Sequence, residues 1–600
     1  MGDDHSRAAQ KEEYVAIIDQ EKVTDEVRDI ALKYDPLNRV GRREGFHVTE
    51  DGELHIDDEN VMEEHKIIAN KIPNDAIEIV RLPAERGELI HQYGENGFRL
   101  YELPAPVESN VVGLLGPNGV GKSTALRILG GLLKPNLGDV NADPDWDTIV
   151  REFRGTGVQT YLEKFRDGTV RTAYKPQRVD RIAARYDGTV RQLLEEREER
   201  SVYDEVITSL DLKGVIERNV GELSGGELQR VAIAATLVAE ADAYLIDEPS
   251  SYLDVGQRVT VARALETLAE DASVLVVDHD LITLDIVADT IHVCYGNPGG
   301  FGVVSRPLSA RRGINQFLNG YLRTDNVRIA ETTIDFRGQT RSSQQDADGT
   351  LLLEFPTMRK ELGSFVLRVE SGAVYEDEIL GILGRNALGK TTFARLLAGT
   401  LEPDTGPTDS NIAISYKPQY LDPAVDGTVR ELFDDYIDIY DRGFKTEIRE
   451  PFNLEPLFNS DVSNLSGGEL QRVSIALALA RDADMYVLDE PSAYLDVEQR
   501  MSFAATLRQY VERTSAACLV IEHDLLLLDY LSDRAMVFEG DPGMNGIGRS
   551  PQGVRQGINR FLQTVDVTFR RDPNTGRPRA NDPDSQKDRE QKKTGDYYAT

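Results

Sequence analysis

Cysteine, tryptophan, long apolar runs and positive charge are all scarce in this chain of 600 residues. Its two cysteines, Cys294 and Cys518, lie in apolar strand-like runs. They therefore predict buried thiols and exclude a disulfide framework or a cysteine metal cluster. No apolar run approaches the roughly 18 residues of a membrane span, and no charged-then-apolar signal segment opens the chain. We therefore expect a cytoplasmic protein of about three or four domains without a membrane partner.

The charge is strongly negative, because 103 acidic residues against 68 basic ones leave a formal net charge of −35. Arginine outnumbers lysine three to one, the acidic residues occur in all regions, and the C-terminus is not acidic. This composition is typical of a protein that works in multimolar salt, and it indicates a halophilic, archaeal host. Because the Debye length falls to about 3 Å at 1 M salt, the acidity does not exclude a nucleic-acid partner.

Two segments have the sequence of a phosphate-binding loop: GPNGVGKST at 116–124 and GRNALGKTT at 384–392. Each follows an apolar strand and precedes a helical run, which is the context that a P-loop requires. In such a loop the main-chain N–H groups and the helix N-terminus bind phosphates, and Lys122 and Lys390 are expected to reach the β- and γ-phosphates. The other predicted ligands are Ser123 and Thr391 for Mg²⁺, and Gly116, Asn118, Gly119, Gly121, Thr124, Gly384, Asn386, Gly389 and Thr392 for the nucleotide.

The sequence LSGGELQR occurs twice without change, at 223–230 and 465–472. We call these the signature segments. A serine before two glycines is a typical start of a helix, and its exact repetition in addition predicts a role facing a phosphate. The residues expected to contact nucleotide are Ser224, Gly225, Gly226, Ser466, Gly467 and Gly468.

Two further pairs of segments end buried strands with polar side chains. AYLIDEPSSYLD at 243–254 and MYVLDEPSAYLD at 485–496 predict that Asp247 and Asp489 face Mg²⁺. The acidic residue that follows each aspartate is expected to orient the attacking water, and VVDHD and VIEHD are expected to place a histidine beside the γ-phosphate. The predicted catalytic residues are Glu248, Glu490, His279 and His523.

These repeated elements together resemble ATP-binding-cassette (ABC) ATPases. The resemblance implies an α/β fold with two ABC-type nucleotide-binding domains in tandem, packed head to tail within a monomer. Each ATP then lies between the P-loop of one cassette and the signature segment of the other, so Lys122 works with Ser466 and Lys390 works with Ser224. It also implies that the glutamines of YKPQ couple nucleotide to neighbouring domains and contribute to Mg²⁺ binding, and that an upstream aromatic ring stacks on adenine. The residues implied are Gln177, Gln419, Tyr93, Phe98 and Phe365.

The two predicted sites are similar but differ at one loop position. Both retain the glutamate, so we expect both to hydrolyse ATP. Ala387 stands where the first loop has Gly119. Its added methyl group is expected to narrow the phosphate-binding loop. Whether the two sites bind nucleotide equally therefore stays open.

Comparison of the spacings reveals an insertion in the first cassette. The distance from P-loop lysine to glutamine is 55 residues in the first cassette and 29 in the second, whereas the distance from glutamine to signature serine is 47 in both. The 26 extra residues break at RGTG between two short amphipathic runs, which predicts a helix–loop–helix at about 144–168. Such an insert is either neutral decoration or a docking element, and we favour docking.

The segments after each cassette also form a repeated pair, with GINQFL in 299–330 and GINRFL in 546–600, the latter ending in a basic tail. With the insert, these segments resemble the E subfamily of ABC proteins over residues 75–600. The two cassettes are then 78–298 and 331–545, with the segments between and after them as hinges. The resemblance implies a ribosome-recycling factor. Such a factor binds the small ribosomal subunit and its RNA beside a release factor or a Pelota-type factor, and it splits ribosomes when its cassettes close on ATP. RNA contacts are expected from Arg306, Arg311, Arg312, Arg555 and Arg560.

The first domain, 1–77, departs from that subfamily. In the family it resembles a two-cluster ferredoxin with eight cysteine ligands, the second four in a run that ends in proline. An alignment anchored on Pro73 for the second four positions, and made with a one-residue gap for the first four, finds no cysteine at any of them. The replacements are Val23, Val27, Ala31, Asp35, Met62, His65, Ile68 and Ile72. We therefore expect a degenerate ferredoxin-like domain without an iron–sulfur cluster, with ATP and Mg²⁺ as the only cofactors.

This loss of ligands leaves other functions open. A cluster-free paralogue that acts as a ribosome-bound regulatory or biogenesis ATPase is one alternative. The soluble motor of a membrane importer, whose membrane subunits are separate chains, is a second.

Overall fold

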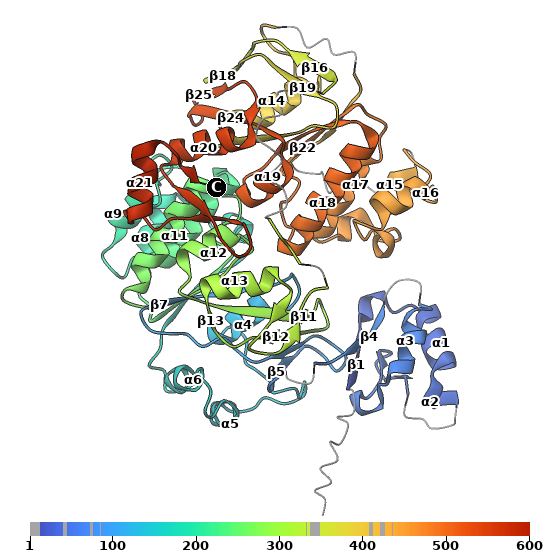
Figure 1. The fold of residues 1–600 in the computed structure, drawn as a ribbon. Helices are drawn as coiled ribbons and strands as arrows, with labels where there is room; N and C mark the ends of the chain where they lie inside the picture. Colours follow the sequence, from blue (N-terminus) through green and yellow to red (C-terminus); the bar gives the residue numbers. More distant parts are fainter. Residues whose placement is uncertain are drawn as a thin grey trace, which may run out of the picture.

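The computed structural model describes residues 13–39, 45–72, 76–83, 86–331, 333–336, 349–406, 412–419, 427–434 and 436–599. Pro73, the anchor of the alignment above, lies outside these residues. In Figure 1 a small N-terminal domain (blue) lies beside a first α/β unit (cyan to green), and a second α/β unit (yellow to orange) packs on that first unit. The C-terminal segment (red) runs back to the helices of the first unit.

The N-terminal domain is built on two antiparallel strands, β1 (Tyr14–Ile18) and β4 (Ile77–Arg81). Helix α1 (Asp25–Tyr34) begins where the Thr24 hydroxyl accepts the main-chain N–H of Val27. The remaining elements are α2 (Pro36–Arg39), β2 (His47–Val48), β3 (Leu54–His55) and α3 (Lys66–Ala69). Apolar side chains from these elements form a small separate core.

The first cassette contains a sheet of order β5-β6-β12-β11-β7-β10-β9-β8. Its strands are β5 (Leu89–Gln92), β6 (Arg99–Tyr101), β7 (Asn110–Leu115), β8 (Thr172–Lys175), β9 (Ala243–Asp247), β10 (Ser273–Val277), β11 (Thr290–Asn297) and β12 (Phe301–Val304). The central strands pair in parallel and are continuous apolar runs, as expected for strands covered on both faces. The helices that bear on the site are α4 (Lys122–Leu129), α10 (Gly225–Leu237), α11 (Val255–Ala269) and α12 (Leu281–Val287).

The second cassette repeats this sheet strand for strand, in the order β17-β18-β25-β24-β20-β23-β22-β21. Its strands are β17 (Met358–Leu362), β18 (Phe365–Val369), β20 (Ile379–Gly384), β21 (Ile414–Lys417), β22 (Met485–Asp489), β23 (Ala517–Ile521), β24 (Arg534–Asp541) and β25 (Asn545–Gly548). The corresponding helices are α14 (Lys390–Leu397), α17 (Gly467–Leu479), α18 (Val497–Thr514) and α19 (Leu525–Leu531). The predicted fold of two tandem α/β cassettes is confirmed.

Two helices, α5 (Trp146–Glu152) and α6 (Gln159–Arg166), occupy the inserted segment of the first cassette. They pack on each other through the rings of Trp146 and Phe165, 4.9 Å apart. The Tyr161 hydroxyl donates to the main-chain oxygen of Leu129 at the end of α4, at 2.7 Å. The insert is therefore fixed to the helix that follows the first P-loop.

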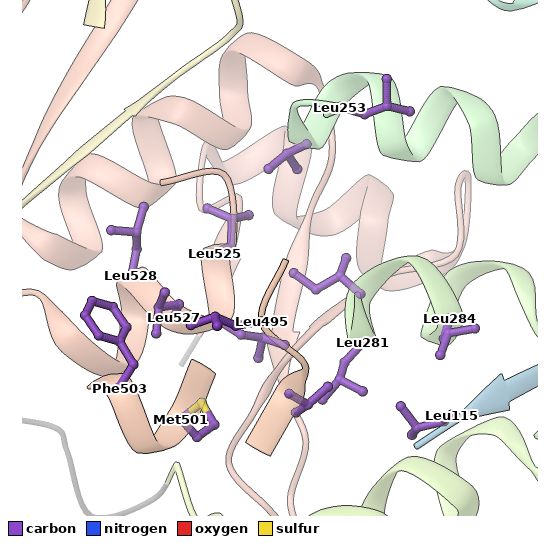
Figure 2. Close-up of a cluster of buried hydrophobic side chains, with 14 of the residues drawn as sticks. Leu115, Leu253, Leu281, Leu284, Leu495, Met501, Phe503, Leu525, Leu527 and Leu528 are labelled. Atoms are coloured by element: carbon purple, nitrogen blue, oxygen red, sulfur yellow. The ribbon is translucent and has the colours of Figure 1, made fainter. Parts of the chain in front are cut away.

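A helix follows each cassette: α13 (Ala310–Leu318) packs on β11, and α20 (Val554–Val565) packs on β24. The chain ends in the C-terminal sheet, β27 (Phe569–Arg571), β28 (Pro578–Ala580) and β29 (Tyr598–Ala599), with α21 (Gln586–Thr594). Strand β28 contacts α12 of the first cassette. The largest cluster of buried apolar side chains includes residues of both cassettes, such as Leu281 and Leu495 (Figure 2). No helix within the described ranges is long and apolar enough to cross a membrane.

Candidate ATP sites between the cassettes

Each P-loop folds around its own lysine. The ammonium group of Lys122 donates to the main-chain oxygens of Gly116 and Pro117 at 2.8 and 2.5 Å, and that of Lys390 donates to Gly384 and Arg385, both at 2.8 Å. Both side chains are buried, and burial lowers the pKa of both, that of Lys390 to about 8. The positive charges therefore lie inside the two loops that the sequence predicts to hold phosphates.

The loop glycines adopt conformations that few other residues accept. Gly119 and Gly121 have φ of +76° and +86°, and a Cβ at Gly121 would lie 2.7 Å from the ring of Phe98. Ala387, the counterpart of Gly119, also adopts the left-handed region, with φ of +58°. Its methyl group thus leaves the loop in the same conformation, at a cost of about 1–2 kcal/mol in backbone strain.

The two aspartates expected at Mg²⁺ lie at the ends of β9 and β22. Burial raises the pKa of both carboxyls, that of Asp489 to about 6. Oδ1 of Asp247 and both carboxylate oxygens of Asp489 are buried without a hydrogen-bond partner, and the hydroxyls of Ser123 and Thr391 lie beside them. Because Mg²⁺ prefers oxygen ligands, these side chains fit a magnesium site and would hold the ion there.

The predicted catalytic glutamates lie next to the predicted histidines. His279 Nε2 is 3.7 Å from Glu248 Oε1, and His523 Nε2 is 3.4 Å from Glu490 Oε1. Burial lowers the pKa of both histidines, which favours neutral imidazoles, and burial raises the pKa of Glu248. Gln177 Nε2 donates to Glu248 Oε1 at 2.6 Å. The structure therefore brings glutamine, glutamate and histidine together in the first cassette.

Contacts across the interface are reciprocal. The main-chain N–H of Asn118 donates to Asp496 Oδ2 at 3.1 Å, and that of Asn386 donates to Asp254 Oδ2 at 3.0 Å. The amide of Asn386 also lies close to Gly226, where an added Cβ would be 3.7 Å from Nδ2. Each P-loop thus faces the loop after the predicted catalytic glutamate of the other cassette, and the second P-loop also faces the signature segment of the first. This is a head-to-tail arrangement.

The three candidate adenine contacts do not have equal surroundings. Tyr93 is 38% exposed, and its hydroxyl lies 3.4 Å from Thr124 Oγ1 at the first P-loop. Phe98 and Phe365 pack against the last P-loop glycines, where a Cβ would lie 2.7 and 3.1 Å from their rings. The phenylalanines therefore support the loops, and Tyr93 offers its ring to solvent.

The positions of the missing cysteines are filled mainly by packed side chains. Seven of the eight replacements are buried, and Met62 is partly exposed. Asp35 and His65 could ligate a metal, and they face each other, with His65 Nε2 3.6 Å from Asp35 Oδ2 and neither side chain exposed. In the ranges that the structure describes, no group of three or more histidine, cysteine or acidic side chains could hold a metal ion. These residues do not fit an iron–sulfur cluster.

The five arginines expected at RNA lie on the hinge segments, and four of them have an acidic partner within the chain. Arg311 pairs with Asp572, Arg560 pairs with Glu539 and Arg555 pairs with Asp596. Arg306 is 76% exposed, with a weak 4.0 Å contact to Asp325, and Arg312 is exposed.

Several residues of the sites were missed in reading the sequence. Asp254 and Asp496 end the repeated segments SYLD and AYLD. The same segments contain Tyr252 and Tyr494, whose hydroxyl groups lie 3.0 Å apart across the cassette interface. Gln229 and Gln471 donate hydrogen bonds to the main-chain oxygens of the predicted catalytic glutamates. Their occurrence in both copies of a repeat was the available signal.

The fold and the two composite sites define a tandem ABC ATPase, an enzyme that hydrolyses ATP. A family model described as ABC transporter matches residues 107–251 and 367–493.

The chain is 44% identical over 589 residues to an uncharacterised ABC transporter ATP-binding protein of Methanocaldococcus jannaschii, with 97% of each chain covered. It is 43% identical over 541 residues to ABC transporter E family member 1 of Arabidopsis thaliana, covering 89% of this chain and 90% of the plant protein. A solved structure of ribosome-bound archaeal Pelota and ABCE1 matches with a TM-score of 0.91 and 44% identity, covering 98% of this chain and all of the other. The chain belongs to the E family of ABC proteins.

Proposed function

We propose that this protein is an ATP-dependent ribosome-recycling factor of an archaeal, halophilic host. It binds the small ribosomal subunit and its RNA beside a release factor or Pelota-type factor, splits the ribosome as its cassettes close on ATP, and is reset by hydrolysis. The observation that carries the proposal is the reciprocal pairing of Asn118 with Asp496 and of Asn386 with Asp254. It supports two ATP sites at the interface, where nucleotide would draw the cassettes together. The relative described as bound to a ribosome with Pelota supports the partner.

Within each site the side chains have separate roles. The P-loop lysine and main-chain N–H groups hold the phosphates, and Asp247 and Asp489 hold Mg²⁺ with the P-loop hydroxyls and the glutamines of YKPQ. Glu248 and Glu490 orient the attacking water, and His279 and His523, which lie beside them, contact the γ-phosphate. Bound Mg²⁺ neutralises the charge that develops on the phosphate oxygens. The insert and the hinge arginines face ribosomal RNA, where the bidentate guanidinium group suits phosphate contacts.

A subunit-splitting assay tests the proposal. The full chain and a chain lacking residues 1–75 are incubated with ribosomes, a Pelota-type factor and ATP at multimolar KCl, and the subunits are separated on gradients. We expect the full chain to convert ribosomes to subunits with ATP. No splitting is expected when AMP replaces ATP. If the full chain stays on small subunits with ATP but never splits ribosomes, the alternative of a regulatory or biogenesis ATPase replaces this proposal. The side chains that fill the cluster positions are the feature that favours that alternative.

We also propose that the N-terminal domain holds no iron–sulfur cluster. The apolar replacements stabilise the domain by burial in place of cluster ligation. Protein purified without oxygen is expected to contain well under one iron per chain and to show no absorbance band near 400 nm. A brown protein with stoichiometric iron and sulfide would contradict this part of the proposal.

A further inference from the structure

The main-chain oxygen of each water-orienting glutamate accepts a hydrogen bond from a buried glutamine. Gln229 Nε2 donates to the oxygen of Glu248 at 2.6 Å, and Gln471 Nε2 donates to that of Glu490 at 2.7 Å. The glutamates have φ of +49° and +46°. A residue with a side chain stays in this region only where its surroundings hold it there. The glutamine contact is therefore part of what fixes the direction of each carboxylate.

The glutamine is the side-chain donor that both sites share. Lys175 also donates to the oxygen of Glu248, at 3.0 Å, but its counterpart Lys417 donates to Asp489 and Pro418 instead. The main-chain N–H groups of the glutamates are bonded to the neighbouring strand in both cassettes, at 2.8 and 3.0 Å. Loss of the glutamine thus removes the side-chain hydrogen bond to the glutamate carbonyl that both cassettes have in common.

Each glutamine also lies on the helix that begins at a signature segment. Helix α10 starts at Gly225, with Ser224 capping it, and Gln229 follows within the next turn. The N-terminus of α10 faces the second P-loop, because an added Cβ at Gly226 would lie 3.7 Å from Asn386 Nδ2. One short piece of helix therefore joins the signature segment of the second ATP site to the glutamate of the first.

We propose that Gln229 and Gln471 are positioning residues that orient the glutamate of one ATP site from the signature helix facing the other. Contact of that helix with nucleotide at one site then sets the rate of hydrolysis at the other. The proposal rests on the roles assigned to Glu248 and Glu490 under the proposed function. Helix α17 begins at its signature serine, Ser466, in the same way, and it holds Gln471 against Glu490.

Single-site backgrounds test the positioning role. In a Glu490→Gln protein only the first site turns over, and Gln229→Met removes the amide donor while keeping the volume of the buried side chain. We expect kcat for ATP to fall about 10- to 100-fold, as for a misplaced catalytic group, with KM unchanged. In the same background, the fall in kcat caused by Gln471→Met is expected to be at least fivefold smaller than the fall caused by Gln229→Met. In a Glu248→Gln background, where only the second site turns over, Gln471→Met should have the larger effect. Thr236→Val, which removes a buried hydroxyl further along α10, is the matched control.

The outcomes separate the two levels of the proposal. Hydrolysis by the Glu248→Gln, Glu490→Gln double variant would reject the roles of the glutamates themselves. Equal effects of the two glutamine variants in one background, or a rise in KM without a fall in kcat, would overturn the positioning role alone. If Gln229→Met does not fold, Gln229→Asn keeps the amide but is one methylene too short to reach the carbonyl, and the same fall in kcat is expected.

A double-mutant cycle tests the connection between the sites. In the Glu490→Gln background, Ser224→Ala weakens the contact of α10 with nucleotide at the second site. We expect it to lower kcat of the first site when Gln229 is present and to have little further effect after Gln229→Met. Additive effects of the two substitutions would contradict transmission through this residue.

Discussion

Replacing Glu248 and Glu490 together with glutamine is expected to lower kcat for ATP hydrolysis by about 10²- to 10⁴-fold, while ATP still binds. Glutamine keeps the shape of glutamate but cannot accept a proton from water. The P-loop lysines and the aspartates proposed to hold Mg²⁺ remain in place, so the nucleotide should accumulate between the cassettes. Steady-state hydrolysis and retention of labelled ATP on a desalting column measure the two effects.

Glu402→Gln is the matched control for this double variant, because Glu402 is an exposed glutamate that follows α14. It is expected to hydrolyse ATP at the rate of the unmodified protein. Hydrolysis by the double variant at more than a tenth of that rate would show that other groups orient the water.

Replacing Asp285 with asparagine is expected to lower the free energy of local opening of the C-terminal sheet by about 3–5 kcal/mol. Asp285 on α12 accepts hydrogen bonds from Arg577 at 3.0 Å and from Arg579 at 2.7 Å, and the side chains of Asp285 and Arg577 are almost fully buried. Removal of the carboxylate leaves the fully buried guanidinium group of Arg577 without its anion, whereas Arg579 is partly exposed and keeps a 3.9 Å contact with Asp572. Hydrogen exchange of residues 567–581 measures this opening.

The control is an exposed ion pair in the same part of the chain. Asp596→Asn removes the partner of Arg555, 3.6 Å away and about half exposed, and should cost less than about 1 kcal/mol. Equal protection factors in the two variants would contradict the view that the buried pairs hold the C-terminal sheet against the first cassette. Because these buried pairs are little screened, their contribution should persist at multimolar KCl.

The parts of the molecule that could be predicted are those that repeat. The P-loops, the signature segments and the strands that end at Asp247 and Asp489 each occur twice in register, and a local pattern is enough to place them on strands and helices. The tandem α/β fold follows from the same repeats. The contact of Asn118 with Asp496 could not be predicted from the residues, because it joins segments 378 positions apart and depends on how two cassettes pack.

Charge patterns were a poorer guide than repeats. The C-terminal tail has a basic composition, yet Arg577 is fully buried in an ion pair with the first cassette. Composition does not distinguish an arginine that faces solvent from one that pairs internally, since both are polar in the sequence. In the N-terminal domain, likewise, Asp35 and His65 occupy cluster positions 30 residues apart, and only the fold places them face to face.

The central claim is that each ATP site combines the P-loop of one cassette with the signature segment of the other, and photolabelling of occluded nucleotide tests it most directly. Ser224→Arg is introduced into the Glu248→Gln, Glu490→Gln protein. The protein is loaded with 8-azido-ATP, unbound nucleotide is removed, and the occluded nucleotide is then cross-linked by light. The account predicts loss of label from the peptide around Phe365 and retention of label on the peptide around Tyr93, because Ser224 serves the second P-loop. Loss of label around Tyr93 with retention around Phe365 would contradict it.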